Sequence, residues 1–201
     1  MRELLNELIS SILQIILFSL IPFIWWLITA RHKESFFSWI GLKKINGTNW
    51  RKMLLMIAIT VGAFWLIGEW SLYSMKDTET ADSAFSHGGI AVIPAVFVYA
   101  VLHTALTEEI LFRGFMLKRI ASRFGFVAGN TIQAILFGMI HAVGFFGQVG
   151  LLTAVPVFYF TGGIAFVMGY INEKKADGSI IPSWTIHTVT NIISGLVTAL
   201  T

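Results

Sequence analysis

Long apolar stretches without charged side chains dominate the first half of the chain. Residues 8–30 carry no Asp, Glu, Lys or Arg over 23 positions, residues 53–75 carry only Glu69, and residues 88–107 carry none. A helix of about 20 mainly apolar residues spans the hydrocarbon core of a bilayer. The first stretch is longer than the roughly 7–15 apolar residues of a signal peptide, so we expect it to be retained as a helix. The pattern therefore predicts three transmembrane helices in this half.

The second half contains 49 consecutive residues, 124–172, without a charged side chain. At about 1.5 Å per residue, one helix of that length would be roughly twice too long for a single crossing. Three glycines in "GFFGQVG", residues 144–150, favour a break at that point. The pattern therefore predicts a fourth span near 127–143, a fifth near 151–171 and a sixth over 179–201.

Composition agrees with a membrane protein. Hydrophobic residues make up 56% of the chain and charged residues only 12%, about half of the roughly 25% usual in soluble domains. Residues 107–122 are predicted to continue the third span or to form an interfacial helix. The expected fold class is an all-α polytopic membrane helical bundle with about six transmembrane helices plus this segment. We expect a single integral membrane domain over 1–201, with a motif-bearing core at about 88–201.

The basic residues test this count, because Lys and Arg favour cytoplasmic loops. With six crossings, twelve of the fourteen Lys and Arg residues fall on one side of the membrane. They are Arg31, Lys33, Lys43, Lys44, Arg51, Lys52, Arg113, Lys118, Arg119, Arg123, Lys174 and Lys175. We therefore expect a multi-pass protein of the cell membrane with both termini outside the cytosol. The stretch "LTEEILFRGF", residues 106–115, is then expected near the cytosolic leaflet.

Ionisable side chains are rare in these spans, and two glutamates end the third span. Glu109 and Arg113 are four residues apart, so they lie on one helix face and can form an ion pair. Glu108 points about 100° away from Glu109 around the helix, so it does not need to share that pair. A charged group within a membrane helix is costly, and such groups are often functional.

Two further spans carry a polar residue with a partner at the same helical spacing. Phe137 and His141 lie one turn apart in the fourth span, and His187 and Asn191 lie one turn apart in the sixth. We expect the three polar faces to turn inward to a shared polar cavity. Each pair also has a structural explanation, because polar side chains hold membrane helices together by hydrogen bonds. The spacing alone leaves both explanations open.

Other polar residues and glycines receive structural or no roles. Glu69 is expected to be solvated near an interface, and Gln133 to make an interhelical hydrogen bond. The glycines of "TGGIAFVMG", residues 161–169, are expected to allow close helix packing. No role is assigned to His32, His87 and His103.

The chemistry that suits these residues is hydrolysis. A carboxylate and an imidazole in an apolar surrounding can act as a general base, and His with Asn can stabilise a developing oxyanion. The chain has no Cys and no "GxSxG", which favours water as the nucleophile. A divalent metal such as zinc held by Glu108, His141 and His187 is an alternative, although "HExxH" is absent.

Taken together, the motifs resemble a known family. "EEILFR" (108–113), "FGMIH" (137–141) and "HTVTN" (187–191) match Glu-Glu-x-x-x-Arg, Phe-x-x-x-His and His-x-x-x-Asn in the expected order. This arrangement looks like the CPBP or Abi family of intramembrane proteases, which includes type II CAAX prenyl endopeptidases and bacteriocin-processing proteins. The first two spans carry no motif of the family.

The resemblance implies an intramembrane endopeptidase with a helical core and a cavity open towards the cytosol. Glu108 and His141 would activate the attacking water, and His187 and Asn191 would form the oxyanion site. Glu109 and Arg113, with Phe137, would position the catalytic helix or the substrate. This mechanism requires no cofactor.

The implied partners are a peptide or membrane-protein substrate and the lipid bilayer, with no nucleic acid. The compact chain is typical of a bacterial plasma-membrane protein. Two alternatives remain open at this point. One is a non-catalytic protein of bacteriocin self-immunity or regulation that binds a partner in the same cavity. The other is a proton- or ion-coupled transporter, although the sequence has no repeat symmetry to support it.

Overall fold

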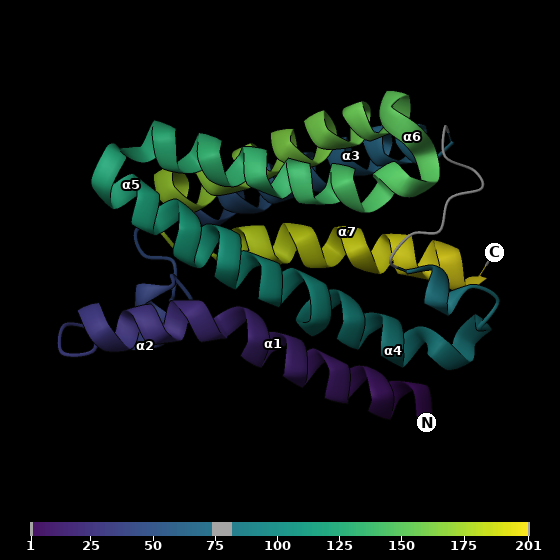
Figure 1. Cartoon of the computed structure of the whole chain (residues 1–201), viewed down its shortest axis with the longest axis horizontal. Helices are drawn as coiled ribbons and strands as arrows, with labels where there is room; N and C mark the ends of the chain where they lie inside the picture. The colour runs from purple at the N-terminus through teal and green to yellow at the C-terminus, as the bar shows by residue number, and fades with distance from the viewer. Residues whose placement is uncertain (1, 74–81, 201) are drawn as a thin grey trace.

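The computed structural model describes residues 2–73 and 82–200, without the side chains of residues 69–73 and 149. Over these ranges the chain is helical and forms no strand. In chain order the helices are α1 (Arg2–Thr29), α2 (Phe36–Trp39), α3 (Trp50–Tyr73), η1 (Ser83–Phe85), η2 (Gly89–Val92), α4 (Ile93–Val98), η3 (Tyr99–Leu106), η4 (Glu109–Leu117), α5 (Lys118–Phe124), α6 (Phe126–Lys175) and α7 (Ile181–Leu200). The all-α fold class is therefore confirmed (Figure 1).

The third span is longer than its apolar stretch alone predicted. The elements η2, α4, η3, η4 and α5 follow one another and form one apolar helix of 36 residues, Gly89–Phe124. Residues 107–122 continue this helix, which was one of the two alternatives for that segment. The helix is π-helical in η3 and η4. We call the helix Gly89–Phe124 the long helix below.

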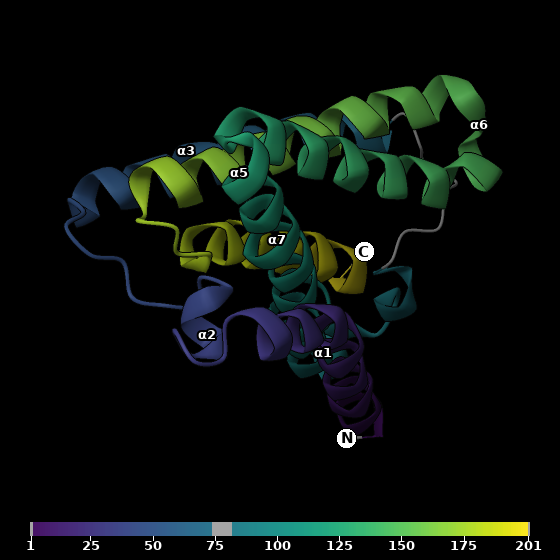
Figure 2. The ribbon, with the colours of Figure 1, turned by 60° about the vertical axis from the view of Figure 1, so that its left-hand side comes forward.

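The fourth and fifth spans are the two halves of α6. At Gly150 the backbone leaves the helical region, with φ 70° and ψ 178°, a conformation that glycine adopts without a steric penalty. The halves Phe126–Gln148 and Gly150–Lys175 fold back on one another (Figure 2). The break predicted within residues 144–150 therefore occurs at Gly150, the last glycine of that stretch.

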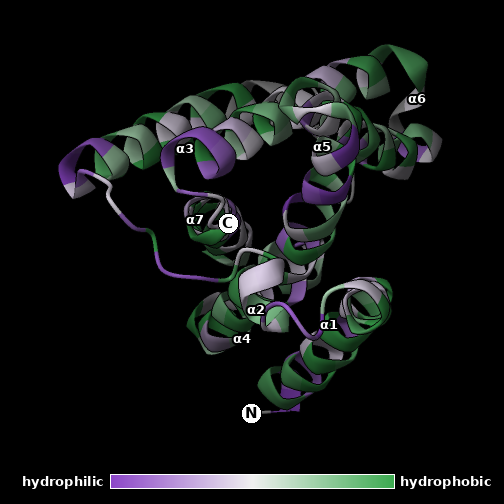
Figure 3. Ribbon diagram, turned by 90° about the vertical axis from the view of Figure 1, so that its left-hand side faces the viewer, coloured by the Kyte–Doolittle hydropathy of each residue, from purple (hydrophilic) through white to green (hydrophobic). Residues whose placement is uncertain are grey.

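The helix α7 lies in the centre of the bundle. It packs against α3, α6, η3 and α4, and the end-on view shows it between α3 and α6 on one side and α4 on the other (Figure 3). Five other helices in the described ranges are long and apolar enough to cross a membrane. The 20 residues of α7 include polar side chains that lower its hydropathy, and with α7 the count is six, as predicted.

The outer helices expose apolar side chains, and the basic side chains gather at one end. Ile28 on α1 and Leu66 on α3 are 78% and 66% exposed, as expected for surfaces that face lipid. The helices α2 and α5 lie at one end of the bundle, and both chain termini lie at the other (Figure 1). At the α2–α5 end, Lys118 Nζ contacts Glu173 Oε1 at 2.6 Å, and Arg119 stacks on Trp39. The architecture is that of a multi-pass membrane protein.

Candidate active site

The two glutamates lie near the middle of the long helix, where its two π-helical segments meet. Glu108 separates η3 from η4, and Glu109 begins η4. A π-helical stretch inside a helix is rare and often marks a functional site. The side chain of Glu108 is 21% exposed, whereas that of Glu109 is fully buried. The adjacent carboxylates therefore occupy different environments.

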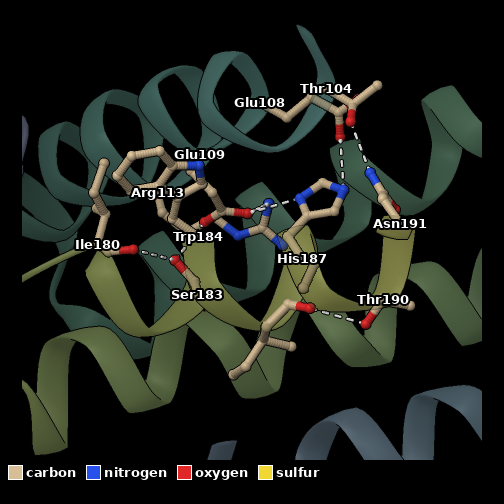
Figure 4. A network of polar contacts seen from close by, with 12 residues as sticks. Thr104, Glu108, Glu109, Arg113, Ile180, Ser183, Trp184, His187, Thr190 and Asn191 are labelled. Carbon is tan, nitrogen blue, oxygen red and sulfur yellow. Dashed lines mark hydrogen bonds and ion pairs between the residues drawn. The ribbon is translucent and has the colours of Figure 1, made fainter. Parts of the chain in front are cut away.

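Glu109 is the centre of a buried polar network that joins the long helix to α7 (Figure 4). Its carboxylate lies 3.0 Å from Arg113 Nη1 and 3.2 Å from His187 Nδ1. It also accepts a hydrogen bond of 2.5 Å from Ser183 Oγ. Asn172 of α6 donates in turn to Ser183 Oγ at 2.7 Å. These contacts hold three helices together around one carboxylate.

Arg113 is fully buried and contacts an aromatic ring of α6. Its guanidinium lies 4.3 Å from the centre of the Phe137 ring, a cation–π distance. The contact with Glu109 is an ion pair without hydrogen-bond alignment, and among the described residues no atom accepts a hydrogen bond from the guanidinium. The Phe137 ring also packs on Phe112 and on His141, at 5.0 and 4.4 Å between ring centres. Phe137 therefore links the ion pair to the imidazole of His141.

The ring orientation of His141 is fixed by its own helix. Its Nδ1 lies 2.9 Å from the carbonyl oxygen of Phe137, one turn earlier. A carbonyl oxygen only accepts, so Nδ1 carries the hydrogen. In the neutral ring the lone pair is then at Nε2, the nitrogen that can take a proton.

His187 stands between the two glutamates. While its Nδ1 faces Glu109, its Nε2 lies 3.8 Å from Glu108 Oε2. One turn further along α7, Asn191 Nδ2 donates to Thr104 Oγ1 at 2.7 Å. The long helix and α7 are therefore joined on both sides of Glu108 (Figure 4).

All four candidate catalytic side chains, Glu108, His141, His187 and Asn191, line one cavity. Its volume is about 160 Å³, enough for several water molecules. A second, mainly apolar cavity of about 270 Å³ adjoins it and shares three of these four residues. Aromatic side chains of α3 and α6 line the second cavity; they are Phe64, Trp65, Phe137, Phe145 and Phe160.

Both cavities extend away from the basic end of the molecule. The polar cavity runs from Glu108 to Asp82 and Tyr99, which lie towards the end with the chain termini. The opening towards the cytosol that the resemblance implied stays a prediction, because the lining residues do not show which end of the molecule faces the cytosol. Arg113, further along the long helix in the basic direction, is fully buried.

Asp82, Ser194 and Thr198 are site residues that the motifs did not predict. Asp82 Oδ2 accepts hydrogen bonds from Ser194 at 2.6 Å and from Thr198 at 3.2 Å. Ser194 and Thr198 continue the helix face of His187 and Asn191 at helical spacing, so a longer polar stripe was present in the sequence. In the sequence, the mainly polar residues 76–87 separate the second and third apolar stretches. Residues 76–81 lie outside the described ranges, whereas Asp82 packs on α7.

Other predicted residues lie outside the cavity. Gln133 donates to the Ala165 carbonyl oxygen at 3.0 Å, the interhelical bond expected of it. His103, which received no role, contacts α1 instead. The side chain of Glu69 lies outside the described part of the structure.

The described residues do not form a metal centre. No group of three or more His, Asp or Glu side chains among them is arranged to hold a metal ion. The alternative metal ligands Glu108, His141 and His187 are not such a group in the described structure, and whether the protein uses a metal ion stays a prediction.

Comparison with known proteins identifies the family. The chain matches the family model of the Rce1-like type II CAAX prenyl endopeptidases over residues 89–193, just over half of its 201 residues. No curated protein and no solved structure matches the chain. The matched range contains all three motifs and begins after α3, in agreement with the absence of a motif in the first two spans. The chain belongs to the Rce1-like family of type II CAAX prenyl endopeptidases.

Proposed function

We propose that the protein is an intramembrane endopeptidase that hydrolyses a peptide bond with a water molecule activated by Glu108 and His141. The observation that carries this proposal is the common cavity, which brings four polar side chains from three helices together. A carboxylate and an imidazole nitrogen on one small polar cavity are the groups that general-base hydrolysis needs.

The reaction begins with water attacking the carbonyl carbon of the substrate. One proton of the water passes to Glu108, whose Oε2 has no hydrogen-bond partner among the described residues, or to His141 Nε2. Asn191 Nδ2 has a second hydrogen besides the one given to Thr104, and protonated His187 would donate through Nε2. These two groups stabilise the oxyanion. The C–N bond then breaks, and the stored proton passes to the leaving amine.

The residues around Glu109 position the catalytic groups. Glu109 holds Nδ1 of His187, which directs Nε2 of that ring towards Glu108. Arg113 and Phe137 connect the Glu109 network to the ring of His141. The proposed mechanism has no step that passes through a metal ion.

The proposed location is the bacterial plasma membrane, with the α2–α5 end in the cytosol because it carries most of the basic residues. The proposed substrates are peptides or membrane proteins that reach the cavity within the bilayer. Since both cavities extend towards the opposite end, we propose that substrates approach the site from the half of the bundle that contains Asp82.

Cleavage of a peptide library by the protein in liposomes tests this function. We expect wild type to produce new peptide termini and Glu108→Gln to produce none. Glu3→Gln, which alters an exposed carboxylate on α1, is the matched control and should cleave like wild type. Identical products from wild type and Glu108→Gln would contradict the proposal.

A second candidate is a non-catalytic immunity protein that binds its partner in the same cavity. The Glu109 network favours it, because that network alone gives Glu109, Arg113 and His187 structural roles. In cells that depend on such immunity, Glu108→Gln would then retain full protection. Loss of protection with unchanged protein stability would argue for catalysis instead.

A further inference from the structure

The first helix, α1, binds the long helix through three polar contacts at His103. Its Glu7 Oε1 lies 2.5 Å from His103 Nδ1, and its Gln14 Oε1 lies 3.0 Å from His103 Nε2. Gln14 Nε2 also donates to the backbone carbonyl oxygen of His103 at 3.2 Å. Glu7 and Gln14 are seven residues apart and therefore lie on the same face of α1. We call Glu7, Gln14 and His103 the α1 clamp.

The hydrogen positions in the clamp follow from its acceptors. The His103 carbonyl oxygen only accepts, so the amide nitrogen of Gln14 faces it and the amide oxygen faces the ring. His103 Nε2 must then carry a hydrogen. A second hydrogen lies between Nδ1 and the Glu7 carboxylate, because both would otherwise present lone pairs at 2.5 Å. Both ring nitrogens of His103 are therefore held by α1.

The clamp acts on the turn that leads into Glu108. His103 lies within η3, and its carbonyl oxygen also accepts a 2.5 Å hydrogen bond from Thr107 Oγ1, immediately before Glu108. The His103 ring packs against Tyr99, which lines the polar cavity together with Glu108. On the other side of this segment, α7 holds Thr104 through Asn191.

Burial makes the clamp more than an incidental surface contact. The side chains of His103 and Glu7 are only 21% and 17% exposed, and most of the outer surface of α1 is apolar. An ionisable group in such a position is unfavourable unless it is paired. Glu7 and His103 supply that pairing for one another.

We propose that the α1 clamp is a positioning device for the reaction: it holds the π-helical segment η3 so that Glu108 faces the cavity. This inference rests on the proposed peptidase function. The helix α1 precedes the matched family range of residues 89–193. The inference therefore gives a helix without a family motif a role in positioning the catalytic residues. A displacement of about 1 Å can slow an enzyme about a hundredfold.

The test compares Glu7→Leu and Gln14→Leu with Glu3→Leu in liposomes. Glu3 lies one turn before Glu7 on α1 and is exposed, so it is a matched control. We expect both clamp variants to lower kcat about tenfold to hundredfold with KM within about twofold of wild type. Glu7→Gln keeps a hydrogen-bond acceptor and should retain most of the activity, whereas Glu3→Leu should behave as wild type.

Hydrogen–deuterium exchange of backbone amides in residues 99–108 gives a readout that does not need catalysis. We expect faster exchange there in Glu7→Leu than in Glu3→Leu. Wild-type kcat in Glu7→Leu, an equal loss in Glu3→Leu, or unchanged exchange would overturn the proposal. If wild type cleaves no peptide, the peptidase function fails, and exchange alone then decides for or against the clamp.

Discussion

At the scale of single residues, the neighbouring glutamates have separate tasks because their surroundings differ. Glu109 is fully buried and contacts Arg113, Ser183 and His187. Glu108 lines the cavity, and among the described residues it forms no comparable network. A buried charge needs partners, whereas a general base needs access to water. The first role belongs to Glu109 and the second to Glu108.

Replacing each glutamate by glutamine should separate stability from activity. Glu109→Gln leaves the buried charge of Arg113 unpaired, which should lower the free energy of unfolding by about 3–5 kcal/mol. Glu108→Gln should change it by less than about 1 kcal/mol, because its side chain is partly exposed. Chemical denaturation in detergent measures both.

A double variant tests whether the unpaired charge of Arg113 causes the loss of stability in Glu109→Gln. Glu109→Gln combined with Arg113→Met removes both buried charges and should recover part of the stability. Equal stability losses in Glu108→Gln and Glu109→Gln would contradict the division of tasks between the two glutamates.

At the scale of elements, the close approach of the two halves of α6 determines where His141 lies. A side-chain carbon at Gly138 would meet the Phe158 carbonyl oxygen at 2.6 Å and Gly162 Cα at 3.1 Å. Only glycine allows this crossing, which lies one turn before His141. The prediction that glycines of the fifth span permit close packing is thus confirmed at Gly162, whereas Gly163 has no described atom within 4 Å of such a carbon.

Gly138→Ala should therefore destabilise the protein and Gly163→Ala should not. Overpacking at position 138 is expected to cost about 1–3 kcal/mol and to lower cleavage by moving His141. Gly163→Ala should leave stability unchanged or raise it, because alanine is the better helix former. Thermal unfolding of both variants checks this, and an unaffected Gly138→Ala variant would refute the close crossing.

The spacing of residues along each helix predicted much of the site, but it could not predict contacts between segments that are far apart in the sequence. The i, i+4 spacing placed His187 and Asn191 on one face of α7, and the structure brings both to the cavity. The spacing gave no indication that Glu7 contacts His103, 96 residues away, or that Asp82 packs on α7. Such pairs depend on how helices pack, which hydropathy along one chain does not encode.

At the scale of the whole molecule, charge is segregated along the bundle axis. The helices α2 and α5 lie at one end of the bundle and both chain termini at the other (Figure 1). Most of the basic residues belong to α5, to the segments beside α2 and to the last turn of α6. Positively charged loops remain in the cytosol during insertion. The predicted orientation therefore places the α2–α5 end inside the cell. That the chain forms a single domain stays a prediction.

Single cysteines can report this orientation, because the chain has no cysteine of its own. We expect Glu3→Cys to react with a membrane-impermeant maleimide on intact cells. Lys44→Cys and Lys174→Cys, at exposed positions of the basic end, should react only after permeabilisation. Labelling of Lys44→Cys on intact cells would contradict the predicted orientation and indicate the opposite one.

The measurement that tests the central claim most directly is the initial rate of cleavage of one identified peptide by two matched variants in liposomes. Loss of a general base typically slows a reaction about 10²–10⁴-fold. Glu108→Gln should therefore be at least about a hundredfold slower than wild type, while Glu3→Gln should keep the wild-type rate. A Glu108→Gln rate equal to that of Glu3→Gln would contradict the assignment of Glu108 as the group that activates water.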